Sequence, residues 1–126
     1  MNDLAPVQTA IYAALTSAPS TYPVYDPVPQ GVARPYIAIS VVDGSPDEEL
    51  ATATTDASFQ IDTWSATPGR AQSYAMLQFV RARLDNQSIA GTWSVSEDFV
   101  TVMEDPSSTA TNRLYHGVAR YRARVG

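Results

Sequence analysis

The segment from Arg113 to Val125 restricts the fold more than any other, because small and apolar residues alternate there with charged ones. Successive side chains of a β-strand point to opposite faces of the sheet. The pattern therefore predicts a long final strand with one apolar face and one cationic face. The apolar face would hold Tyr115, Gly117, Ala119, Tyr121, Ala123 and Val125, and the opposite face would hold His116, Arg120, Arg122 and Arg124.

Further strands are predicted upstream of this segment. Tyr36 to Val42 is rich in β-branched and aromatic residues, and Ala57 to Ser65 alternates apolar with polar residues. We expect these two strands to pair antiparallel around a long polar connection from Asp43 to Asp56. Gly91 to Val95 and Phe99 to Met103 are predicted to complete the β-region.

Two segments have the apolar spacing of amphipathic helices. The first begins near Asp3, which can cap it, and the second is predicted to begin at Thr67-Pro68 and to run to about Asp85. Between the first helix and the first long strand, Ala18 to Pro35 contains five prolines, which exclude a helix and predict an extended excursion. We expect that excursion to be held against the body of the protein by Tyr22, Val24 and Tyr25.

The predicted elements combine into one α+β domain covering residues 1–126, with two α-helices packed on one face of a mostly antiparallel β-sheet. The loop between the first two main strands is long and acidic. No apolar run approaches the roughly 20 residues that span a bilayer, and the N-terminus lacks the pattern of a signal peptide. We therefore expect no membrane association.

Charge and cysteine content exclude several functions. A net charge of -5 argues against binding to duplex DNA, and the absence of cysteine excludes disulfides and thiolate metal sites. The charge is divided unevenly. Residues 1–62 contain eight acidic residues and one arginine, whereas residues 63–126 contain five acidic residues and seven arginines. The complementary halves suit either contact within one chain or head-to-tail association of copies.

Catalytic, cofactor and metal sites have little support in the sequence. His116 is the only histidine, and neither a nucleophile elbow nor a glycine-rich phosphate loop is present. We expect no catalytic residue and no cofactor, with His116 a strand histidine at a surface or an interface. Asp43 and the acidic segment, defined as Asp47, Glu48 and Glu49, lack the calcium-loop spacing, so no metal site is predicted. The alternatives for the acidic segment are a solvated loop and an arm that orders when a neighbouring subunit or the tube binds.

The arginine face, defined as Arg120, Arg122 and Arg124, places three like charges on one side of a strand. Such charges repel each other unless carboxylates oppose them. Those carboxylates could come from a neighbouring strand of the same subunit or from the acidic segment of a neighbouring subunit, and a nucleic-acid contact is the third alternative. The acidic residues considered for the neighbouring strand are Glu97, Asp98 and Glu104.

Two short motifs accompany this order of elements. Arg34-Pro35-Tyr36-Ile37 leads into the first long strand, and Asp62-Thr63-Trp64-Ser65 ends the second. With the length of the chain and its Tyr/Arg-rich last strand, they give it a resemblance to the phage tail-completion, or tail-terminator, family, which also occurs in gene transfer agents. The resemblance covers nearly the whole chain. It implies a role in the subunit fold for Pro35, Tyr36, Gln60 and Trp64.

The resemblance implies a structural virion protein that acts in virus assembly and is no enzyme. Members of the family form hexameric rings that cap the tail tube and provide the surface for head-tail joining. The implied partners are further copies of the chain, the major tail tube protein and the head-closure or connector protein, with DNA passing through the lumen without specific binding. The implied location is the head-tail junction of the virion, after assembly in the host bacterial cytoplasm. The resemblance places the acidic segment and the arginine face near subunit or tube contacts.

Two other functions fit the sequence less well. One is another neck or tail component, such as a head-closure or tube-like protein. The other is a small monomeric hydrolase or ligand-binding domain, which would not form a ring.

Overall fold

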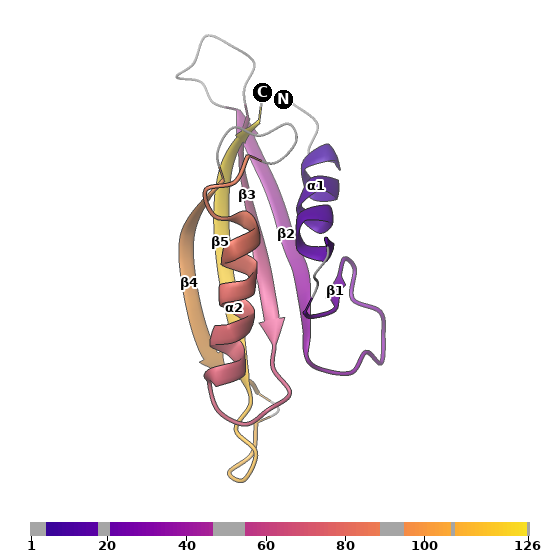
Figure 1. Cartoon of the computed structure of the whole chain (residues 1–126), viewed down its shortest axis with the longest axis vertical. Coiled ribbons are helices and arrows are strands. Elements are labelled where there is room, and N and C mark those ends of the chain that lie inside the picture. Colours follow the sequence, from indigo (N-terminus) through magenta and orange to yellow (C-terminus); the bar gives the residue numbers. More distant parts are fainter. Residues whose placement is uncertain (1–4, 18–20, 47–54, 89–94, 107, 126) are drawn as a thin grey trace.

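Five strands form a single sheet in the part of the chain that the computed structural model describes, residues 5–17, 21–46, 55–88, 95–106 and 108–125 (Figure 1). The strands are β1 (Val24–Tyr25), β2 (Tyr36–Pro46), β3 (Thr55–Trp64), β4 (Ser96–Glu104) and β5 (Tyr115–Val125), in the spatial order β1-β2-β3-β5-β4. All neighbours pair antiparallel except β1, which is parallel to β2. The final strand therefore lies between β3 and β4, and β4 forms one edge of the sheet.

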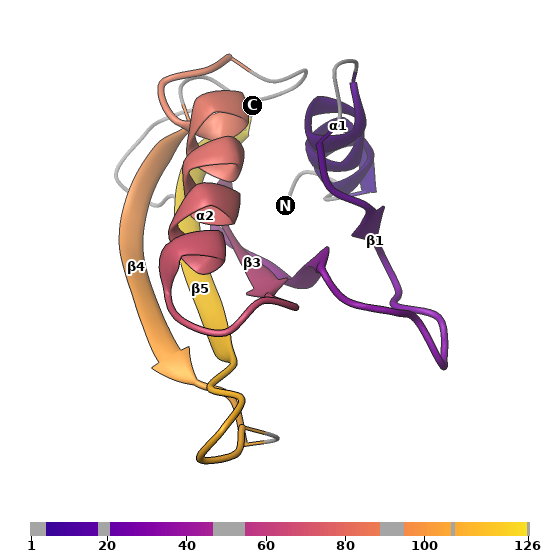
Figure 2. The same ribbon diagram turned by 60° about the horizontal axis from the view of Figure 1, so that its bottom comes forward.

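Two helices, α1 (Ala5–Thr16) and α2 (Ala71–Leu84), cover the same face of this sheet (Figure 2). The predicted α+β architecture is confirmed. The core lies between the helices and the covered face, and the opposite face, away from the helices, is called here the open face. Large side chains that are fully buried include Tyr121, Phe59, Ile11, Leu15, Ile37, Ile61, Met76 and Leu84.

The alternation predicted for the last strand is confirmed. Burial of Tyr121 against Phe59, with ring centroids 5.8 Å apart, joins the two central strands through the core. The small residues between the tyrosines leave room for α2 to approach the sheet. The strand buries Tyr115, Gly117, Ala119, Tyr121 and Ala123 on the covered face and exposes Arg120, Arg122 and Arg124 on the open face.

The hairpin of β2 and β3 is longer than predicted. Asp43 pairs with Ser58, and Asp56 pairs with Ser45, so both aspartates belong to strands and not to the connecting loop. Of the expected strand Gly91 to Val95, all but Val95 lies outside the described residues. Val95 is not in a strand; it is fully buried, and its backbone is hydrogen-bonded to the segment that follows α2.

The predicted start of the second helix was wrong, because α2 begins at Ala71 and not at Thr67-Pro68. The Oε1 atom of Gln72 accepts hydrogen bonds from the backbone N–H groups of Ala66 and Thr67, at 2.6 and 3.0 Å. Gly69 has a φ of +89°, which is outside the range of a right-handed helix. The segment is thus held as a turn that precedes the helix.

The proline-rich excursion is extended and held against the body, as predicted. Tyr22 packs edge-to-face on Phe79 of α2 with ring centroids 5.6 Å apart, Val24 is buried, and Tyr25 packs on Tyr36. These contacts fix the path of a segment whose described residues, 21–35, contain one short strand and no helix.

The two helices are tied together by Arg83 of α2. Its guanidinium donates to the carbonyls of Ala14 and Ser17 at the end of α1, at 3.2 and 2.7 Å. The last carbonyls of a helix have no partner within the helix and carry a partial negative charge, so a cation at this position stabilises α1.

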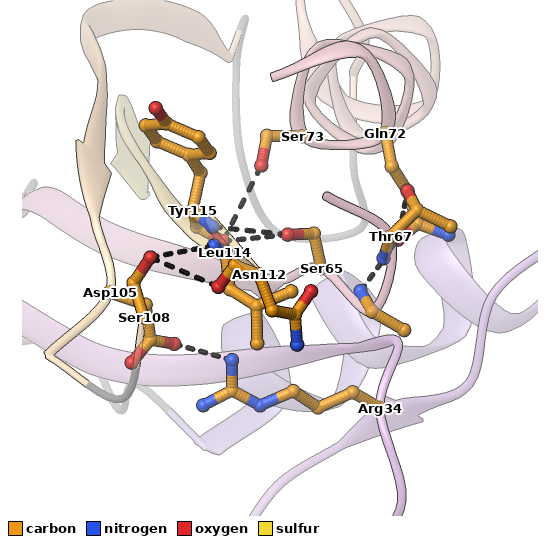
Figure 3. Close-up of polar contacts among 11 residues, drawn as sticks. Arg34, Ser65, Thr67, Gln72, Ser73, Asp105, Ser108, Asn112, Leu114 and Tyr115 are labelled. Carbon is orange, nitrogen blue, oxygen red and sulfur yellow. Dashed lines mark hydrogen bonds and ion pairs between the residues drawn. The ribbon is translucent and has the colours of Figure 1, made fainter. Parts of the chain in front are cut away.

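The two motifs that carry the family resemblance meet at one end of the sheet, beside the connection between β4 and β5 (Figure 3). Ser65 Oγ donates to the carbonyl of Tyr115 at 3.0 Å, and Arg34 forms an ion pair with Asp105, whose side chain is 3% exposed. The guanidinium of Arg34 also lies 5.3 Å from the centre of the Trp64 ring. These contacts explain why motif residues distant in sequence belong to one structural unit.

Candidate assembly surface

The arginine face lies on the open face, in β5. In the sheet register Arg120 is opposite Gln60 on β3 and Phe99 on β4. Arg122 is opposite two serines, Ser58 and Ser96, whereas Arg124 is opposite Asp56. The register therefore gives one of the three arginines an acidic neighbour and places the other two beside neutral side chains.

The side-chain contacts agree with the register. Arg120 Nε donates to Gln60 Oε1 at 3.0 Å, and Arg124 Nε lies 3.6 Å from Asp56 Oδ1. Arg122 is exposed and forms no ion pair with a residue in the described ranges. The guanidinium groups of Arg120 and Arg122 thus lie next to each other without a carboxylate from the described part of the subunit.

Acidic residues of β4 do not neutralise the arginine face. Glu97 receives two hydrogen bonds from Arg81 of α2, at 2.7 and 3.0 Å, and Glu104 pairs with Arg113 at 2.7 Å. Asp98 falls in the register shift between Glu97 and Phe99 and forms no ion pair within the described ranges. The hypothesis that β4 supplies the carboxylates is therefore wrong for Glu97 and Glu104. Both bind arginines outside the arginine face, and Asp98 forms no ion pair with it in the described ranges.

The acidic segment lies outside the described residues, so its role stays a prediction. The positions where it leaves and rejoins the sheet are described. Pro46 pairs with Thr55, and Thr55 pairs with Val125, next to Arg124 in β5. The residues on either side of 47–54, Pro46 and Thr55, therefore lie at the end of the sheet next to Arg124.

Two apolar side chains on the open face were missed as site residues by the sequence analysis. Phe99 and Met103 of β4 are 52% and 46% exposed. The solvent-facing side of an antiparallel sheet is ordinarily polar. A signal was present, since Phe99 and Met103 alternate with Val100 and Val102, which makes β4 apolar on both sides.

His116 is packed within the sheet. Its ring stacks on Trp64 with centroids 3.7 Å apart, and its Nε2 atom lies 2.9 Å from Asp62 Oδ1. Both members of the His116 and Asp62 pair are largely shielded from solvent. This arrangement is that of a structural strand histidine. The described ranges contain no group of three or more His, Cys, Asp or Glu side chains that could hold a metal ion.

The carboxyl group of Asp62 is held in its charged form. Burial by itself raises the pKa of this group, but hydrogen bonds with His116, Ser40 and Gln60, together with the charge of His116, outweigh burial. The net effect lowers the pKa of Asp62 below its ordinary value. A carboxyl group with a lowered pKa in the folded state stabilises the fold above its unfolded pKa, about 3.9, and loses that contribution as the pH falls through the folded value.

Replacing Asp62 with asparagine is therefore expected to flatten the acid side of the stability profile. The wild type should lose stability between about pH 5 and about pH 2.5, and Asp62→Asn should lose less over that interval. Urea unfolding at several pH values measures the difference. Asp98→Asn, at an exposed carboxyl group without an ion pair in the described ranges, is the control. Equal losses in the wild type and Asp62→Asn would contradict the assignment.

The family of the chain follows from a comparison with known proteins. A family model described as "Tail completion protein gp17" matches residues 9–126. The chain belongs to this family. It is therefore a structural protein of the tail and a component of the virion, as the resemblance implied. Such a component contacts other virion proteins. No helix in the described ranges is long and apolar enough to cross a membrane.

A solved structure shares the tail completion fold. A chain of "Virion of native gene transfer agent (GTA) particle" has a TM-score of 0.79 and 21% sequence identity to this chain. The match covers 94% of this chain and 93% of that chain, so the likeness in fold extends over nearly the whole of both. A comparison with curated proteins finds no match.

Proposed function

We propose that six copies of this chain form a ring that caps the tail tube and joins it to the head connector, without catalysing a reaction. The observation that carries the proposal is the open face, where Arg120 and Arg122 lack carboxylates and Phe99 is half exposed. A closed ring requires each subunit to present two different, complementary patches. A surface that combines unneutralised arginines with an exposed aromatic ring meets that requirement for one of the two patches.

The proposed partners are the major tail tube protein on one side of the ring and the head-closure protein on the other. This arrangement would place the protein at the head-tail junction, after assembly in the host bacterial cytoplasm. DNA would pass through the lumen. The net charge of -5 supports passage without specific binding, because phosphate contacts require a surplus of cations.

Imaging of particles tests the proposal. A producing strain that lacks this gene should yield heads and tails that are not joined, and purified protein added to those tails should form rings at one end and restore joining. Native mass spectrometry of the capped ends should give six copies. Joined particles in the deleted strain, or tails that bind single subunits, would contradict the proposal.

A further inference from the structure

The open face has a mixed patch at the edge of the sheet, formed by Phe99 of β4 with Arg120 and Arg122 of β5. Phe99 and Arg120 are paired in register, and Arg122 lies two residues further along the same face. The ring of Phe99 is half exposed and both arginines are exposed. We call these three residues the β4–β5 patch. It offers an apolar contact beside two guanidinium groups that can bind carboxylates through paired hydrogen bonds.

The described part of the subunit does not supply those carboxylates. Four acidic residues around the sheet already have partners, and each partner lies outside the patch. The pairs are Glu97 with Arg81, Glu104 with Arg113, Asp56 with Arg124 and Asp62 with His116. Two adjacent like charges on one strand face are unfavourable without a counter-charge. The patch therefore fits an acidic ligand that also carries an apolar side chain.

One segment of the chain has this chemistry. The acidic segment Asp47, Glu48 and Glu49 is followed directly by Leu50, and it is the longest run of acidic residues in the sequence. Its carboxylates match the two arginines, and Leu50 matches the exposed ring of Phe99. We propose that the segment Asp47 to Leu50 of one copy binds the β4–β5 patch of the next copy. This inference rests on the proposed ring, for which it names the two complementary patches.

The dimensions of the sheet limit which residues of the β4–β5 patch the segment of the same copy can reach. The row of Pro46, Thr55 and Val125 is five residues of β5 away from the row of Arg120 and Phe99. That is about 17 Å along the strand, and Phe99 lies three strands from Pro46, about 14 Å across, which gives about 22 Å in all. Leu50 is four residues beyond Pro46, a span of at most about 14 Å. The Cα atom of Leu50 in the same copy therefore stops about 8 Å short of that of Phe99, even with the segment fully extended. Two side chains can span that gap, so the mixing and cross-linking experiments decide between the same copy and the next.

Charge reversal tests the inference in the purified protein at concentrations where copies associate. One variant is Arg120→Glu with Arg122→Glu, and the other is Glu48→Arg with Glu49→Arg. Each variant alone should associate at least about tenfold more weakly than the wild type, because every contact becomes repulsive. An equal mixture should associate again, since each variant then offers its neighbour an opposite charge. Arg113→Glu, which reverses an exposed arginine that precedes β5 and lies outside the patch, is the control.

The mixture also distinguishes pairing between two copies from pairing within one copy. Pairing within one copy predicts that mixing restores nothing, because each variant would still repel its own segment. A failure of the mixture to associate would therefore overturn the inference. So would normal association of either variant alone. Circular dichroism shows whether the exposed substitutions leave the subunit folded.

Cross-linking gives a second test that does not depend on stable rings, since the natural chain contains no cysteine. Leu50→Cys and Phe99→Cys, carried on separate chains of different mass, should form a mixed disulfide-linked dimer under mild oxidation. Arg120→Glu with Arg122→Glu, or salt at about 1 M, should reduce its yield severalfold. Ala82→Cys, on the exposed side of α2, replaces Phe99→Cys in the control.

The outcomes distinguish this inference from the proposed function. A mixed dimer no more abundant than the Ala82→Cys control would overturn the inference, and rings imaged on tails would still support the function. A strong mixed dimer with no rings on tails would support the contact between copies and contradict the function.

Discussion

Replacing Gly117 with alanine is expected to lower the free energy of unfolding by about 2 to 3 kcal/mol, and valine at this position is expected to prevent folding. Gly117 lies on the covered face of β5, under α2. A Cβ atom there would stand 2.4 Å from Thr63 Oγ1 and 3.1 Å from Leu77 Cδ1. Both neighbours are buried, so neither side chain has free space into which it can move.

A second substitution tests the cause of this loss. Thr63→Ala removes the atom nearest to the new methyl group, and the hydroxyl that it removes is buried without a hydrogen-bond partner. The pair Gly117→Ala with Thr63→Ala should therefore be more stable than the sum of the two single effects predicts. Urea unfolding followed by tryptophan fluorescence gives the three values. A Gly117→Ala variant within about 0.5 kcal/mol of the wild type would contradict the proposed clash.

The elements of the fold were predictable where the signal is local. The alternation in β5 requires one covered face and one open face, whatever the neighbouring strands are. The apolar spacing of α1 and α2 likewise predicts that each helix has one buried side and one exposed side. The start of α2 was mispredicted because Thr67-Pro68 suits the first turn of a helix. In the structure the Gln72 side chain instead binds the backbone N–H of Thr67, and Gly69 has a positive φ, so the helix begins later. The local preference of Thr67-Pro68 for a helix start does not reveal that a side chain five residues later binds this segment as a turn.

The partners of the charged residues could not be predicted, because they depend on which face each residue occupies. Glu97 is in the strand beside the arginine face, but it is opposite Tyr121 in the register and meets Arg81 of α2. The bulge after Glu97 changes which side chains of β4 share a face with Arg120. Sequence alone does not locate a bulge.

The exposure of Phe99 could not be predicted for a related reason. Both faces of β4 are apolar, so the pattern does not say which one the helices cover. The choice is made by the register with β5, which puts Val100 opposite Ala119 in the core and Phe99 opposite Arg120 on the open face. The arginine face was predictable because β5 is amphipathic. The position of Phe99 beside it depends on how β4 pairs with β5.

Replacing Arg34 with methionine is expected to cost about 3 kcal/mol of stability, because it leaves the carboxylate of Asp105 without its cation. The Asp105 side chain is 3% exposed, so water cannot replace the guanidinium. Methionine keeps most of the apolar length of the arginine side chain, which separates the loss of charge from the loss of packing. The loss should appear in urea unfolding at neutral pH as a lower midpoint with an unchanged slope.

Arg113→Met is the matched control, since Arg113 and Glu104 form an ion pair of the same kind whose side chains are 54% and 45% exposed. An exposed pair contributes about 0 to 1 kcal/mol, so this variant should be close to the wild type. Asp105→Asn should cost less than Arg34→Met, because the Arg34 side chain is 27% exposed and can be solvated when its partner is neutral. Equal losses for Arg34→Met and Arg113→Met would contradict this prediction. They would show that the buried charge of Asp105 contributes no more than an exposed one at the end of the sheet where Arg34 also covers Trp64.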